Sequence, residues 1–461
     1  MIATAGPLGW NARQIAAAVQ SKRADPVEVI AAFLRQIHRT NPAVNALIDH
    51  NDAAPLEDAA QVRRRVVCGE LLPLAGVPVV VKDSIWVAGR RATQGSLLFR
   101  DFRPDRDALP VERMRQAGAV VIGMGNMPEF GAKEVTENML HGRTLNPCDL
   151  SRTPGGSSGG CAAALASSMA VAALGGDGGG SCRRPPAHVG VVGFKPSPGV
   201  VADPWGFPGT LHGIACTSPM GRTVADTEAL FAAIVGMRPA DPFSVDPAPS
   251  EMPAGRLRVA YSPLLGLDLP LDADVRAAVD GAVDTLRRHG LDVTEADPRW
   301  PHGTAESRIL AIEESGLADL FGARWRTSPE LFDPHISRQI ERGLTRTGAE
   351  VANAHAFSLH IARAFACFFN TWDLLLCPTT ACVAWPADQL DPVMVGGRPA
   401  AHRDHAAFTP LFNHARTPAI SIPCGFGQDR LPVGLQVIGP RLADWRVLAT
   451  AAWMERALAA G

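Results

Sequence analysis

Two glycine-rich segments that lie close together constrain this chain more than any other feature of its sequence. The first is 152–161 (RTPGGSSGGC) and the second is 175–183 (GGDGGGSCR). Each is a glycine loop that delivers a serine to the start of a predicted helix. Glycine permits positive φ and close backbone approach, and successive free N–H groups in such a loop form an anion-binding nest. The functional site is therefore expected at these two loops.

Several familiar uses of such loops do not fit. No G-x-x-x-x-G-K-[ST] motif is present, because no lysine lies between Lys133 and Lys195. No dinucleotide-binding G-x-G-x-x-G with a downstream acid fits either. Residues 155–159 match the G-x-S-x-G nucleophile elbow, which would make Ser157 the nucleophile, but residues 150–154 are a poor strand to precede it. S-x-x-K chemistry is excluded, because no lysine has a serine three residues before it.

Short apolar runs alternate with amphipathic segments along the whole chain. The runs that predict strands are 77–81, 119–123, 171–174, 189–194, 257–261, 291–293, 374–376, 419–422 and 433–438. Helices are predicted within 11–70, before 117, and at 161–169, 223–234, 273–288, 300–360 and 445–458. This mixture predicts an α/β fold. Without a fixed repeat or a long linker, we expect one domain over residues 1–461, with a mixed β-sheet core surrounded by α-helices.

The composition limits the classes of binding partner that are expected. With 44 basic and 46 acidic residues the net charge is -2, so no single-sign field is available for nucleic acid or an anionic membrane. The nine cysteines form no C-x-x-C pair, which favours reduced thiols. No secretory signal is visible and no apolar run is long enough to span a bilayer. We expect a cytoplasmic protein with a small-molecule ligand, and a homodimer as a candidate assembly.

Lys82 is notable because lysine is rare here. Only four of the 44 basic residues are lysines, and Lys82 ends the apolar run 77–81. A desolvated lysine can lose its proton whereas arginine cannot, and a neutral amine beside a serine is a general base. The alternative is a structural lysine that snorkels or pairs with Asp83. Spacing alone favours the structural alternative.

Four segments together resemble the amidase signature family. They are 76–83 (GVPVVVKD), 126–130 (NMPEF), 155–160 (GGSSGG) and 176–183 (GDGGGSCR). Further similarity lies in 136–147, 193–196 (GFKP) and 431–436 (LPVGLQ). The resemblance divides the expected domain into a helical part (1–70), a signature core (71–240), a variable substrate-side region (241–370) and a C-terminal core (371–461).

The resemblance implies a Ser–cis-Ser–Lys triad in the amidase signature fold. By motif position, Lys82 is the base, Ser157 the bridging residue preceded by a cis peptide, and Ser181 the nucleophile of an acyl-enzyme. The N–H groups of Gly178, Gly179, Gly180 and Ser181 are candidates for the oxyanion hole. Gly131 lines the acyl pocket, while Asp177, Ser158 and Arg183 are expected to support the site. No cofactor and no metal are implied.

Some residues depart from the family pattern. Gly178 replaces a small hydroxyl or β-branched residue, which leaves the loop freer, and Cys182 and Arg184 are unusual beside the nucleophile. A thiol nucleophile at Cys182 is disfavoured, because the next position of a helix points about 100° away. His402 and His405 form an H-x-x-H pattern that we interpret as solvent-exposed histidines rather than a metal site. Lys195 is interpreted as structural.

The implied activity is hydrolysis of a carboxylic amide to an acid plus ammonia or an amine. Substrate choice is expected to lie in 125–140 and 295–415. In the variable region, three tryptophans, Trp300, Trp325 and Trp385, and several phenylalanines indicate an apolar or aryl acyl group or else a core. Two alternatives stay open. One is the glutamine-hydrolysing subunit of a tRNA-dependent amidotransferase, and the other is a catalytically impaired amide-binding protein.

Overall fold

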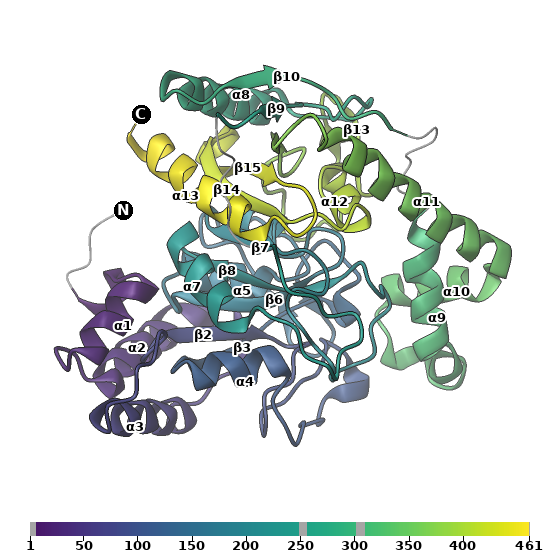
Figure 1. The fold of residues 1–461 in the computed structure, drawn as a ribbon. Helices are drawn as coiled ribbons and strands as arrows, with labels where there is room; N and C mark the ends of the chain where they lie inside the picture. Colours follow the sequence, from purple (N-terminus) through teal and green to yellow (C-terminus); the bar gives the residue numbers. More distant parts are fainter. Residues whose placement is uncertain (1–5, 249–255, 301–308, 461) are drawn as a thin grey trace.

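One mixed sheet of 11 strands crosses the protein (Figure 1). The computed structural model describes residues 6–248, 256–300 and 309–460. The spatial order of the strands is β1 (Leu47–Asp49), β3 (Val120–Gly125), β2 (Pro78–Lys82), β6 (Ala172–Asp177), β8 (Cys216–Gly221), β7 (Val192–Lys195), β14 (Ala419–Phe426), β15 (Pro432–Ile438), β11 (Leu374–Pro378), β9 (Val259–Tyr261) and β10 (Val293–Glu295). The pairs β2–β3, β2–β6, β9–β10 and β9–β11 are parallel. The expected mixed α/β sheet in a single domain is confirmed.

Helices flank the sheet (Figure 1). They are α1 (Ala12–Gln20), α2 (Pro26–Val44), α3 (Ala53–Val67), α4 (Leu109–Gln116), α5 (Gly159–Ala166), α6 (Arg184–Val189), α7 (Val224–Ile234), α8 (Ala273–Arg288), α9 (Leu310–Thr327), α10 (Pro334–Thr345), α11 (Gly348–Phe368), α12 (Pro410–His414) and α13 (Asp444–Ala460). α9, α10 and α11 form a group at the right of Figure 1. Four two-residue strands make two separate hairpins: β4 (Glu137–Asn138) with β5 (Gly142–Arg143), and β12 (Met394–Val395) with β13 (Arg398–Pro399).

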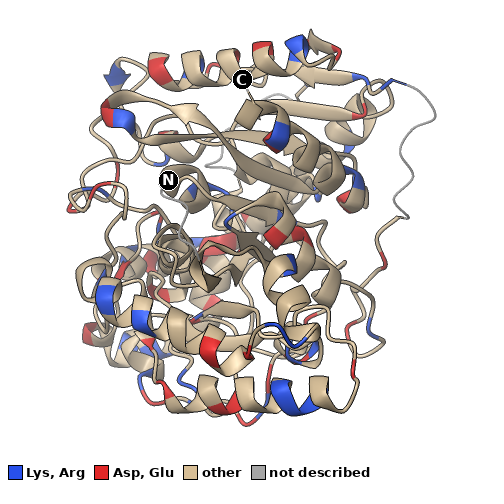
Figure 2. Cartoon of the chain, turned by 90° about the vertical axis from the view of Figure 1, so that its left-hand side faces the viewer, with Lys and Arg blue, Asp and Glu red and all other residues tan. Residues whose placement is uncertain are grey.

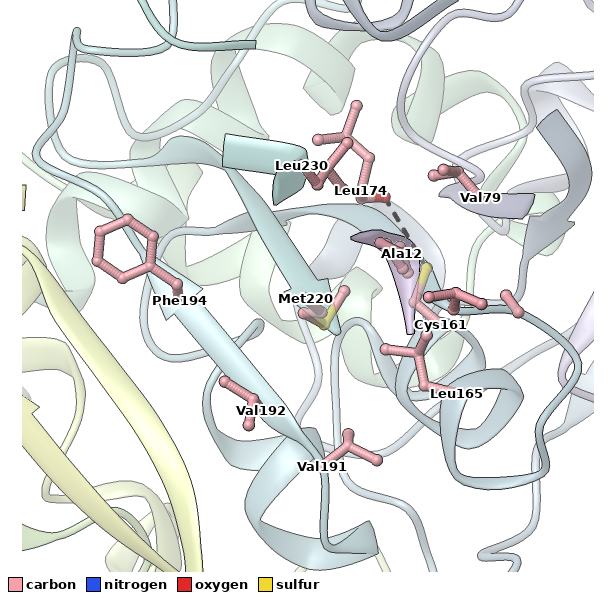
Figure 3. Close-up of a cluster of buried hydrophobic side chains, with 14 of the residues drawn as sticks. Ala12, Val79, Cys161, Leu165, Leu174, Val191, Val192, Phe194, Met220 and Leu230 are labelled. Carbon is pink, nitrogen blue, oxygen red and sulfur yellow. Dashed lines mark hydrogen bonds between the residues drawn. The ribbon is translucent and has the colours of Figure 1, made fainter. Parts of the chain in front are cut away.

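One part of the core lies where α5 packs on β2, β3 and β6. Every residue of β2 is buried, as expected of a parallel strand that is covered on both faces. Figure 3 shows Cys161 and Leu165 of α5 beside Leu174 of β6, with Val79 of β2 in the same cluster. Because α5 begins directly after the first glycine-serine loop and β6 leads into the second, this packing fixes the position of both loops.

Most predicted elements are present, with boundaries that shift by a few residues. The sequence missed β8, which lies between β6 and β7 and contains Pro219, a residue that normally disfavours a strand interior. It also missed β1 within the stretch predicted as helical. One predicted stretch, the helical region 300–360, lies partly outside the described residues, at 301–308.

The region 241–370, expected on the substrate side, is divided in the structure. β9 and β10 form one end of the sheet and α8 packs against β14 and β15, whereas α9 packs beside the site described below. Basic and acidic residues are interspersed along the helices, as Figure 2 shows. All nine cysteines are free thiols. Within the described ranges, no helix is both long and apolar enough to cross a bilayer.

Candidate active site

The site lies where two neighbouring parallel strands end. β2 and β6 run in the same direction, with Val81 paired to Leu174, so their carboxyl ends meet at one edge of the sheet. Ligands of α/β sheets bind outside the carboxyl ends of the strands. β2 ends at Lys82, and β6 ends at Asp177, four residues before Ser181. The topology therefore brings together residues that are far apart in the sequence.

Lys82, Ser157 and Ser181 form one hydrogen-bonded path. Lys82 Nζ donates to Ser157 Oγ at 2.8 Å, and Ser157 Oγ lies 2.9 Å from Ser181 Oγ. The peptide bond between Gly156 and Ser157 is cis. The structure thus brings together the three residues that the resemblance assigns to a triad. Asp83, the alternative partner of Lys82, instead accepts hydrogen bonds from the backbone N–H groups of Thr93 and Gly95.

Burial changes the chemistry of the lysine. Lys82 is only 3% exposed, and Ser157 and Ser181 are 2% and 7% exposed. Desolvation lowers the pKa of Lys82 below its ordinary value of 10.5, and the positive charge of Arg184 lowers it further. Cys182, Cys161 and Asp177 oppose this shift. A lysine in this environment is a better proton acceptor at neutral pH than one in solvent.

A buried ion pair anchors the loop that carries Ser181. The guanidinium of Arg183 binds both carboxylate oxygens of Asp177, at 3.0 and 2.9 Å, and neither side chain is exposed. Burial alone would raise the pKa of Asp177, but Arg183 outweighs it and holds the pKa well below its usual range. Arg183 also donates to Gln436 Oε1 and Asn413 Oδ1, at 2.7 and 2.6 Å. The loop is thereby joined to α12 and β15.

The glycine loop supplies fewer anion donors than the sequence suggests. The N–H of Gly180 donates to Asp177 Oδ1 at 2.8 Å, so Gly180 is corrected from a candidate donor to a structural residue. Its φ of 121° is a conformation that favours glycine. In the described part of the chain, the N–H groups of Gly178, Gly179 and Ser181 have no hydrogen-bond acceptor. These three remain candidates for the oxyanion hole.

The residues beside the serines pack closely. Ser158 N–H donates to Ser181 O at 3.3 Å, which joins the two loops, and Ser158 Oγ lies 3.5 Å from Cys182 Sγ. Cys182 is fully buried, and burial raises the pKa of its thiol, so it is poorly suited to act as a nucleophile. It precedes α6 rather than lying in it, so its orientation comes from the loop. A Cβ at Gly131 would lie 3.2 Å from Ser157 Oγ, so this position borders the triad.

A cavity of about 540 Å³ opens onto the triad. One wall is aromatic: Phe130 and Phe321 stack with ring centroids 3.9 Å apart, and Phe207 lines the same space. Trp300, Trp325 and Trp385 do not line it and belong to hydrophobic clusters instead. The three tryptophans are therefore core residues and do not form a pocket for the acyl group. The aromatic wall comes from phenylalanines in 125–140, in α9 and in the connection between β7 and β8.

Three features of the site were not found in the sequence. The connection between β7 and β8 covers the glycine loop with Leu211, and its only sequence signal is the turn-rich run 205–209 (WGFPG). Glu134 and Arg403 form an ion pair at 3.1 Å in the cavity wall. The prediction that His405 is exposed is wrong, since it is fully buried against Trp385, with a ring-centroid distance of 4.5 Å.

Among the described residues, no group of three or more potential ligands could hold a metal ion.

Known proteins with the same fold make the class clear. The model of the family described as Amidase matches residues 28–448. An acylamidase of Rhodococcus erythropolis is 35% identical over 460 residues, which cover 97% of this chain and 95% of that protein. A glutamyl-tRNA(Gln) amidotransferase subunit from Salinispora tropica is also 35% identical over 485 residues, covering 97% and 96%. A bacterial aryl acylamidase structure has a TM-score of 0.89, with 26% identity and coverage of 97% and 96%.

These findings define an amidohydrolase that acts on the C–N bond of amides. The chain belongs to the amidase signature family, as the motifs around Lys82, Ser157 and Ser181 had indicated.

Proposed function

We propose that this protein hydrolyses a carboxylic amide through an acyl-enzyme on Ser181, with Ser157 and Lys82 as the proton relay. The observation that carries the proposal is the continuous path from Lys82 Nζ through Ser157 Oγ to Ser181 Oγ, at 2.8 and 2.9 Å. A hydroxyl becomes an effective nucleophile when an adjacent base removes its proton. Neutral Lys82 is that base, because burial disfavours its ammonium form.

In the acylation step, Ser181 Oγ attacks the amide carbonyl carbon while its proton passes to Ser157, and the Ser157 proton passes to Lys82. The carbonyl oxygen becomes an oxyanion that accepts from the loop N–H groups, each worth roughly 3–4 kcal/mol. When the C–N bond breaks, Ser157 protonates the leaving nitrogen and recovers a proton from Lys82. Ammonia or an amine departs, and Ser181 carries the acyl group as an ester.

Deacylation uses the same relay with water as the nucleophile. The proton of the attacking water passes to Ser157 and on to Lys82, and then returns to Ser181 Oγ as the ester bond breaks. The carboxylic acid leaves and the starting protonation state is restored. General acid–base transfer of this kind contributes about 10²–10⁴ in rate.

We infer that the amide carries an apolar or aromatic group. The stacked Phe130 and Phe321 and the nearby Phe207 present a flat apolar wall to the cavity that contains Ser181. Aromatic walls bind aromatic groups with about 0.5–1.5 kcal/mol beyond simple burial. The similarity to proteins named acylamidase and aryl acylamidase points to the same class of substrate.

A panel of amides tests the proposal, with mass spectrometry of the protein during turnover. Simple and aryl amides should yield ammonia or amine without a partner protein, and the trapped acyl group should lie on Ser181. Ser181→Ala should abolish both. Label on Ser157 or a cysteine would overturn the assignment of the nucleophile. Tight amide binding without turnover would identify a catalytically impaired binding protein instead.

A second candidate is the glutamine-hydrolysing subunit of a tRNA-dependent amidotransferase. It is favoured by relatives of that name, which match this chain at the same 35% identity as the acylamidase. The aromatic cavity wall disfavours it, because glutamine offers that wall only a short polar side chain. Turnover restricted to glutamine and dependent on a second protein would establish this candidate and exclude the first.

A further inference from the structure

Glu134 contributes a buried carboxylate to the cavity wall, in addition to Asp177 of the loop that carries Ser181. Glu134 lies between Gly131 and β4 and is only 4% exposed. Its Oε1 lies 3.1 Å from Nη2 of Arg403 and 3.8 Å from Nη2 of Arg184. Burial would raise the pKa of Glu134, but the two arginines outweigh it and lower the pKa to about 2. The carboxylate is therefore ionised across any practical assay pH.

Arg184 contacts the loops of both serines. Its Nη1 donates to Gly179 O at 2.6 Å, two residues before Ser181, and its Nη2 donates to Gly156 O at 3.5 Å, directly before Ser157. Thr409 Oγ1 donates to the same Gly179 oxygen at 2.8 Å. One guanidinium thus spans the distance between the two loops.

The other contacts of Glu134 lead to the same loops. A Cβ on Gly156 would lie 2.7 Å from the carbonyl carbon of Glu134, so the backbone at 134 packs directly against the residue before Ser157. Arg403 Nη2 lies 3.6 Å from the Cβ position of Gly179. Arg403 Nη1 lies 3.7 Å from Glu313 in α9, which ties this cluster to the helix that bears Phe321.

We propose that Glu134 is a positioning residue. Its carboxylate, held between Arg184 and Arg403, sets the spacing of the Ser157 and Ser181 loops and so the hydrogen bond between the two serine hydroxyls. This inference rests on the proposed function, because it assumes that Ser157 relays the proton of Ser181. Glu134 acts through the arginines and does not touch the reacting atoms.

A different role for the cluster would be recognition of an anionic substrate by Arg403. The charges argue against it, because Glu134 and Glu313 both face Arg403 and offset its charge. Substrates with and without a carboxylate therefore separate the two roles.

The experiment compares Glu134→Gln and Glu134→Asp with Glu314→Gln. Glu314 is a matched control: it is 2% exposed and lies between Arg342 and Arg346, at 2.6 and 2.8 Å, outside the residues that line the cavity. For each variant, kcat and KM are measured on a neutral anilide and on a carboxylate-bearing anilide, together with the rate at which a fluorophosphonate labels Ser181.

Glu134→Gln should lower kcat and the labelling rate by about 10- to 100-fold, as expected when reacting groups are misplaced by about 1 Å. KM should change by less than about threefold, because a positioning role acts on the transition state. Both anilides should be affected equally. Glu134→Asp keeps the charge, so its kcat should lie between those of the wild type and Glu134→Gln. This variant still tests the inference if Glu134→Gln fails to fold. Glu314→Gln should lower the Tm but keep kcat.

Wild-type kcat in both Glu134 variants would overturn the inference, as would a change confined to the KM of the carboxylate-bearing anilide. Failure of the proposed function appears differently: the wild-type protein would then not acylate on Ser181 at all.

Discussion

Leu211 occupies the space that a side chain at position 178 would need. Its Cδ1 lies 2.8 Å from the Cβ position of Gly178, and Ala215 Cβ lies 3.5 Å from it. The family pattern has a hydroxyl or β-branched residue at this position, so glycine here predicts a freer loop. The structure instead shows a covered loop, in which Leu211 packs where the missing side chain would be.

Restoring a larger residue at position 178 should therefore harm the protein unless Leu211 is reduced as well. We predict that Gly178→Thr lowers kcat by about tenfold through a displaced loop, with a stability cost of about 1–3 kcal/mol for overpacking. Adding Leu211→Ala should recover most of both losses. Steady-state kinetics and urea unfolding measure them, with Leu211→Ala alone as the control. A double variant no better than Gly178→Thr would contradict this account.

The rate should rise with pH through the pKa of Lys82. The proposed relay needs the neutral amine, and burial lowers this pKa from 10.5, so kcat/KM should reach its plateau at a lower pH than a solvent-exposed lysine would allow. Below that pKa the rate should fall tenfold per pH unit. Lys82→Met should abolish turnover and the pH profile with it. Lys22→Met is the control, because Lys22 is exposed and should keep the wild-type profile. A Lys82→Met variant that turns over at neutral pH would exclude the relay.

Removing Arg183 should destabilise the whole protein. Arg183→Met leaves the Asp177 carboxylate buried and unpaired, which costs about 3–5 kcal/mol. The free energy of unfolding in urea should fall by this amount. Arg143→Met is the matched control: it breaks the Arg143–Glu137 pair at 2.9 Å, which is 35% and 39% exposed, and should cost less than about 1 kcal/mol. An equal decrease in the free energy of unfolding in the two variants would mean that burial does not make the Arg183–Asp177 pair more important for stability than the exposed pair.

Phe321 should determine preference for aromatic amides. Phe321→Ala removes one face of the stack with Phe130, so kcat/KM for an aryl amide should fall by about tenfold or more relative to acetamide. Phe426→Ala is the control, because Phe426 is 61% exposed and does not line the cavity. The ratio of kcat/KM for the two amides is the measurement. An unchanged ratio in Phe321→Ala would place the aryl group elsewhere.

The sequence predicts local elements well because their signals are local. The continuous apolar run 77–81 corresponds to β2, and the motif positions of Lys82, Ser157 and Ser181 identify residues that the fold brings within hydrogen-bond distance. β8 was not predictable in the same way, because its residues favour a turn and its strand conformation depends on the neighbours β6 and β7.

Interactions between distant segments explain the other differences. The N–H of Gly180 looks available in a glycine run, and only the position of Asp177 reveals that it is occupied. The pair formed by Glu134 and Arg403 joins residues 269 positions apart, which no local pattern indicates. His405 is buried because Trp385 packs over it, although its own neighbours in the sequence are polar or small.

Arg183 binds residues that are far from it in the sequence, which affects when its loop can fold during synthesis. Its partners Thr409, Asn413 and Gln436 lie 226, 230 and 253 positions further along the chain. Non-local contacts of this kind form late, because the intervening chain must first be closed into a loop. During synthesis, the loop that carries Ser181 can acquire its full set of hydrogen bonds only after β15 has left the ribosome, so a nascent chain that ends before Gln436 contains Lys82, Ser157 and Ser181 but lacks part of the network that anchors this loop.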